Sequence, residues 1–81
     1  MRDASFYEYD TTYFDWEHVD KYDNWLHTFD KLPDRMRLVV DLRMTRTKPQ
    51  EISNIMNISV GTVKQQLDEA RRRFLRGAKL I

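Results

Sequence analysis

The sequence predicts an all-α domain of four helices, and three observations support this class. Apolar residues recur every three or four positions along most of the chain, which is the helical period. No segment alternates apolar and polar residues as a half-buried strand does, and both prolines stand where a new helix can begin. The 81 residues are enough for one core, so we expect one domain over residues 13–81 and an N-terminal arm over residues 1–12.

Composition excludes several classes of protein. The longest apolar run, residues 38–40, is too short for a membrane span, and the chain has no cysteine for disulfides, thiolate metal sites or nucleophilic catalysis. Acidic neighbours such as Asp20 and Asp23 have no nucleophile or third group beside them, so we do not expect an enzyme. We expect a cytoplasmic protein that binds no cofactor or metal, does not associate with a membrane and has no small-molecule substrate.

Charge and aromatic residues are distributed unevenly along the chain. Residues 1–35 carry nine acidic and four basic side chains, whereas residues 36–81 carry four acidic and ten basic ones. Nine of the ten aromatic residues lie between Phe6 and Phe29, so the arm is both acidic and aromatic. Two surfaces with different partners would explain this asymmetry, and so would two faces of one fold that partly neutralise each other.

The first helix is expected over about residues 15–31. Thr12 followed by Asp15 resembles a capping box, and Pro33 fits the first turn of the next helix. The apolar stripe of the first helix consists of Trp16, Val19, Tyr22, Leu26 and Phe29. This stripe is expected to pack mainly in the core. Trp25 lies beside it and is a better candidate for a partner surface, as are the aromatic residues of the arm.

Two further helices are expected before a turn. The second helix would bury Met36, Val39, Val40 and either Leu42 or Met44. Residues 45–48 interrupt the apolar pattern as a linker, after which Pro49 begins a third helix lined by Ile52, Ile55 and Met56. Asn57 follows directly, and asparagine tolerates the left-handed conformation that turns a chain out of a helix.

The last helix is expected to begin after Ser59, a good N-cap residue, and to carry basic residues near its end. Its buried face would consist of Val63, Leu67, Ala70 and Phe74. A short helix, a turn and a longer basic helix over residues 50–73 form the arrangement of a C-terminal helix-turn-helix, a DNA-binding unit. The core that fixes its two helices would consist of Ile52, Ile55, Ile58, Val63 and Leu67.

Residues at the start of the last helix have the chemistry that DNA binding requires. Gly61 and Thr62 are small, which allows the helix to approach the groove floor closely. Lys64 can reach a phosphate, while Gln65 and Gln66 can bond to base edges or to the DNA backbone.

Three segments resemble region 4 of bacterial sigma factors: LPDRMRLVVDLR (residues 32–43), EISNIM (51–56) and ISVGTVKQQLDEARRRF (58–74). The resemblance covers roughly residues 15–78 and implies a four-helix sigma region 4-like fold. The chain departs from the family at residues 46–49, which replace a glycine-containing loop, and at Asn57, where glycine is commonest. Quorum-sensing and response-regulator effector domains share the S-x-x-T-V-K core and remain an alternative.

The resemblance implies a small bacterial or phage transcription factor that binds double-stranded promoter DNA at the −35 element and contacts the β flap of RNA polymerase. Without a counterpart of sigma region 2, it would not melt promoter DNA. The family's recognition helix implies base contacts for Val60, Gly61, Thr62 and Gln65, and phosphate contacts for Ser59, Lys64 and Arg72. The partner surface would come from residues 16–42, with Trp16, Trp25, Phe29, Met36 and Val40 as candidates.

Two other functions remain open at this point. The chain would be a protein-binding regulator if it occupied RNA polymerase or a sigma-type partner without reading DNA, in the manner of an anti-sigma or co-sigma factor. The acidic arm would then cover the basic helix or imitate DNA. A dimeric repressor or activator independent of polymerase is the third reading. A module of this size makes few phosphate contacts, so DNA affinity on its own is expected to be weak and salt-dependent.

Overall fold

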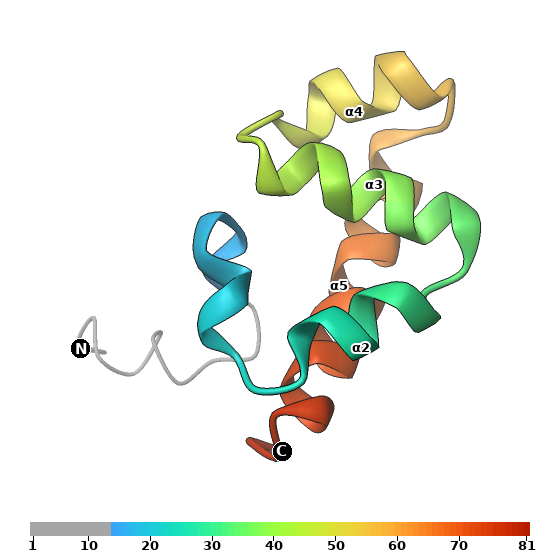
Figure 1. Cartoon of the computed structure of the whole chain (residues 1–81). Helices are drawn as coiled ribbons and strands as arrows, with labels where there is room; N and C mark the ends of the chain where they lie inside the picture. The colour runs from blue at the N-terminus through green and yellow to red at the C-terminus, as the bar shows by residue number, and fades with distance from the viewer. Residues whose placement is uncertain (1–13) are drawn as a thin grey trace, which may run out of the picture.

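The computed structural model describes residues 14–81, so the expected arm and the predicted helix start at Thr12 lie outside the described residues. Within residues 14–81 all the regular secondary structure is helical, which confirms the all-α class. The elements are η1 (Trp16–Lys21), α2 (Trp25–Lys31), α3 (Asp34–Met44), α4 (Pro49–Met56) and α5 (Val60–Gly77). The longest helix, α5, contacts α2, α3 and α4, which are arranged along its length (Figure 1).

The expectation of one continuous helix over residues 15–31 is wrong, because the chain breaks between η1 and α2. Tyr22 is extended (φ −88°, ψ 135°), and Asn24 is left-handed (φ 63°, ψ 19°). An Asp-Asn pair at positions 23 and 24 favours a turn, because both side chains can bond to nearby backbone and asparagine tolerates positive φ. The four expected helices therefore become five helical elements, the first of which is a 3-10 helix.

The break also changes which side chains of this segment are buried. Leu26 was expected in the apolar stripe, but it is 54 % exposed. Trp25 instead packs against the core, with its ring centroid 6.4 Å from that of Phe29. A continuous helix would have kept Leu26 in line with Val19, whereas the turn at Asn24 gives α2 a different rotation about its own axis.

The core is centred on α5, and its expected buried face is confirmed. Phe74 is fully buried, with ring centroids 5.9 Å from Phe14 and 6.3 Å from Trp16. The other buried apolar residues are Phe14, Val19, Leu32, Met36, Val39, Val40, Ile52, Val63, Leu67 and Ala70. Elements η1, α3, α4 and α5 thus share a single core, as a chain of this length requires.

The turn between α4 and α5 has the expected backbone. Asn57 is left-handed (φ 58°, ψ 47°), and its N–H donates to the carbonyl of Ser53. Ile58 packs partly buried against the core, but Ile55, predicted to join it, is 62 % exposed. In the short helix α4, Ile52 alone is buried. Ile55 stands three residues later, so its side chain is rotated around the helix axis and lies beyond the surface that α5 covers.

The linker before α4 turns at Arg46, which adopts a positive φ of 70° where a glycine would be less strained. Its Nε lies 3.1 Å from Glu17 Oε1, so an ion pair joins the linker to η1. At the start of α4, the N–H of Lys48 donates to Glu51 Oε1 over 3.1 Å, which satisfies one of the free donors of the helix end.

Candidate nucleic-acid interface

The first turn of α5 is held by a side-chain cap. Ser59 Oγ accepts a hydrogen bond from the N–H of Thr62 over 3.0 Å, and the two hydroxyl oxygens lie 2.9 Å apart. The predicted N-cap is therefore confirmed. Just beyond it Gly61, Lys64 and Gln65 are exposed, so three of the predicted DNA-binding residues lie together on a stabilised helix end.

Gly61 is not required by the fold. Its φ is not positive, and the nearest atom to a side chain added there is Ser59 Oγ, 3.8 Å away. The position can therefore hold an alanine without strain or clash. The absence of a side chain leaves the backbone of α5 open to a close approach from outside.

Three other predicted residues are less accessible than Lys64 and Gln65. Val60 and Thr62 are half-buried, and Gln66 is half-buried with its Oε1 enclosed and lacking a hydrogen-bond partner among the described residues. The side chain of Gln66 is thus partly committed to the interior. Gln65, which is exposed, is the better placed of the two glutamines for a base contact.

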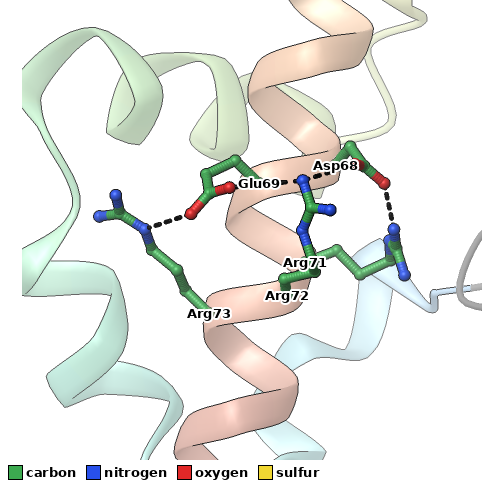
Figure 2. A network of polar contacts seen from close by, with 5 residues as sticks. All are labelled: Asp68, Glu69, Arg71, Arg72 and Arg73. Atoms are coloured by element: carbon green, nitrogen blue, oxygen red, sulfur yellow. Dashed lines mark hydrogen bonds and ion pairs between the residues drawn. The ribbon is translucent and has the colours of Figure 1, made fainter. Parts of the chain in front are cut away.

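Three consecutive basic residues of α5, Arg71, Arg72 and Arg73, are paired with acidic residues of the same helix (Figure 2). Arg72 lies 2.9 Å from Asp68 Oδ2 and 3.4 Å from Glu69 Oε1, and Arg73 Nε lies 3.1 Å from Glu69 Oε2. The Arg72 side chain remains 46 % exposed. A phosphate could reach it, but would compete with two carboxylates.

Arg71 differs from its two neighbours because it is buried, at 4 % exposure. Its Nη2 pairs with Asp68 Oδ1, and its side chain points toward η1 rather than into solvent (Figure 2). Its Nη1 has no hydrogen-bond partner among the described residues. From its spacing, Arg71 belongs to the basic cluster at the end of the helix, but its position three residues before Phe74 turns it toward the core.

Charged groups also stabilise the start of η1. Asp15 Oδ2 lies 3.1 Å from His18 Nδ1 and 3.3 Å from Lys21 Nζ. Desolvation acts to raise the pKa of the Asp15 carboxyl, but the hydrogen bonds and positive charges of His18 and Lys21 together lower that pKa below its ordinary value.

The predicted partner surface needs correction. Met36 and Val40 are 7 % and 0 % exposed, so they belong to the core and are not accessible to a partner. Trp16, Trp25 and Phe29 are half-buried and pack against that core. Sequence periodicity placed these residues on or beside the apolar faces of the first two expected helices, and only packing distinguishes the centre of each face from its rim. The exposed Leu26 was missed as a surface residue, although the Asp-Asn turn signal before it is visible in the sequence.

Among residues 14–81, no helix is long and apolar enough to cross a membrane. The same part of the chain contains no cluster of three or more histidine, cysteine or acidic side chains that could hold a metal ion.

Comparison with known proteins identifies a family. A family model described as "Sigma-70, region 4" matches residues 28–74, which is more than half of the chain and spans α3, α4 and most of α5. Comparisons with curated proteins and with solved structures gave no match.

Proposed function

Because the chain belongs to the sigma-70 region 4 family, we propose that it binds promoter DNA through α4, the Asn57 turn and α5, and that it associates with bacterial RNA polymerase. The observation that carries the DNA-binding part is the exposed start of α5. Gly61, Lys64 and Gln65 lie there on one capped helix end, with nothing in the described chain covering them.

In this proposal the N-terminal half of α5 enters the major groove at the −35 element. Gln65 reads base edges there, while Lys64 and the Ser59 end of the helix contact phosphates. Val60 and Thr62 are half-buried at the edge of the contact, and Arg72 reaches a phosphate only by leaving Asp68 and Glu69.

Salt-dependent DNA binding tests this part of the proposal. The affinity of the chain for duplexes selected from a random pool is measured by fluorescence anisotropy across a range of salt concentrations. Neutralising one phosphate contact in Lys64→Gln should weaken binding to all duplexes and reduce the slope of log affinity against log salt by about one. Lys31→Gln is the matched control, because Lys31 is exposed at the end of α2 on a different element.

The polymerase part is tested separately, with purified bacterial RNA polymerase core enzyme and no DNA. Co-migration of the chain with core enzyme on gel filtration supports the association. Polymerase binding without binding to any duplex at low salt would overturn the DNA-reading role and favour the protein-binding regulator instead.

A further inference from the structure

A pocket of about 300 Å³ lies between η1 and α5, beside the helix end that was assigned to DNA, and shares Lys64 with it. Its lining residues are Trp16, Lys64, Leu67, Asp68 and Arg71. The last four recur at steps of three, one and three residues, so they form one face of α5 opposite the indole of Trp16. The volume is at the lower end of the range for small-molecule sites, enough for one aromatic ring system with a small polar group.

The charges of the lining favour an anion. Lys64 and Arg71 contribute two positive charges against the single carboxylate of Asp68. That carboxylate is already engaged, because its two oxygens pair with Arg71 and Arg72. Arg71 is engaged by the same pair, so the lining keeps one net positive charge, and an acceptor brought by a ligand would meet the exposed ammonium group of Lys64 beside the Arg71 guanidinium group.

Arg71 supplies a second, independent observation. The side chain is 95 % buried, yet its Nη1 has no hydrogen-bond partner within residues 14–81. Buried polar atoms are almost always hydrogen-bonded, and an unpaired donor on a charged group is the least favourable exception. Nη1 is itself enclosed, so a carboxylate oxygen in the pocket would supply the acceptor that this donor lacks once the Arg71 side chain turns toward it.

We propose that this pocket binds a small aromatic carboxylate, with its ring against Trp16 and Leu67 and its carboxylate between Lys64 and Arg71. Because Lys64 is also a proposed phosphate contact, the ligand and DNA compete for its ammonium group. This competition between ligand and DNA rests on the proposed DNA-binding function, whereas the binding of the ligand itself does not.

Ligand binding is tested on the whole chain without DNA. Indole-3-carboxylate is titrated into the ¹⁵N-labelled protein, and the amide resonances of α5 and the indole N–H of Trp16 are followed. Indole-3-carboxamide, which has the same ring and no charge, is the matched probe. We expect the carboxylate to bind at least about tenfold more tightly than the carboxamide, because only the carboxylate pairs with both cations. Shifts should concentrate at Trp16 and residues 64–71.

Variants separate a pocket from nonspecific binding to a basic surface. Lys64→Gln should weaken binding of the carboxylate severalfold and leave the carboxamide unchanged, while Lys31→Gln should change neither. Substitution of the buried Arg71 could unfold the protein, so its loss of binding would not be informative. Lys64 is exposed, and Lys64→Gln therefore tests the pocket without disturbing the core. Equal binding of the two probes, or no shift at Trp16, would overturn the proposal.

The coupling is measured last, by repeating the DNA titration with saturating indole-3-carboxylate. Lower DNA affinity in wild type, with no further loss in Lys64→Gln, supports the shared ammonium group. Unchanged DNA affinity alongside demonstrated ligand binding would overturn the coupling. If no duplex is bound even without the ligand, the proposed DNA function fails, while the ligand result stands.

Discussion

At the scale of single residues, Gly61 separates the needs of the fold from those of DNA binding. A Cβ at this position would make only an ordinary van der Waals contact, with Ser59 Oγ at 3.8 Å, and the backbone there is ordinary helix. Gly61→Ala should therefore stabilise the fold, by up to about 1 kcal/mol, because alanine is the better helix former. The added methyl group would at the same time hold α5 away from the groove floor.

The expected result for Gly61→Ala is a higher free energy of unfolding in urea, together with weaker DNA binding by anisotropy. A variant that is more stable and binds DNA as tightly as wild type would show that α5 does not approach the groove closely at this residue.

Glu69 restrains two of the basic residues of α5. Its carboxylate lies 3.4 Å from Arg72 and 3.1 Å from Arg73, so it competes with DNA phosphates for both. Glu69→Gln should raise DNA affinity severalfold and steepen its salt dependence, because it frees positive charge. Stability should change little, since exposed ion pairs contribute at most about 1 kcal/mol.

The control for Glu69→Gln is Glu17→Gln. It removes an equal charge from η1, where Glu17 pairs with Arg46 of the linker. Equal gains in DNA affinity from both variants would mean that net charge matters and that the position on α5 does not.

At the scale of elements, α2 is held to the end of α5 by a close contact at Gly77. Asn24 Nδ2 donates to the carbonyl of Gly77 over 2.9 Å, and a Cβ at Gly77 would lie 2.6 Å from Thr28 Oγ1. The left-handed Asn24 thus serves two purposes, because it caps the start of α2 and places its own side-chain amide against α5.

Gly77→Ala should lower the free energy of unfolding by about 1 kcal/mol, despite the better helix propensity of alanine, because the methyl group displaces Thr28. In a Thr28→Ala background the same change should become neutral or stabilising. The double-mutant cycle, measured by urea denaturation, should give a coupling of about 1–2 kcal/mol. Additive effects would show that the contact between α2 and α5 is looser than described.

The elements also show where sequence reasoning succeeds. The positions of α3, α4 and α5 follow from apolar period and from local signals at Pro49, Asn57 and Ser59, each of which acts within a few residues along the chain. The break at Asn24 was missed because the apolar residues on either side of it can be aligned on one continuous helix. Ile55 was misplaced because a short helix buries only what its neighbour covers.

At the scale of the whole molecule, the two proposed activities use different parts of the chain. The candidate DNA surface is the start of α5, whereas the polymerase surface is proposed on α2, where Leu26 is exposed beside the half-buried Trp25 and Phe29. An acidic, aromatic front half and a basic rear half agree with this division.

Leu26→Asp should abolish co-migration with RNA polymerase and leave DNA affinity within about twofold of wild type, because it places a charge in an apolar contact on α2, away from the start of α5. Ile55→Asp is the matched control for polymerase binding, since Ile55 is equally apolar and exposed, at 62 %, on α4. Loss of polymerase binding in both variants, or in neither, would place the polymerase surface elsewhere.

The sequence by itself determined the helical class, the helix-turn-helix with its Asn57 turn and Ser59 cap, and the resemblance to the family. The helices, the turn and the cap depend on interactions between residues that are close together in the chain, and the resemblance depends on the sequence alone. Only the tertiary structure decided that Leu26 and Ile55 are surface rather than core, that Arg71 is buried against η1, and that Trp16 lines a pocket beside α5. Periodicity identifies the apolar face of a helix, but how much of that face is covered depends on the elements that pack against it.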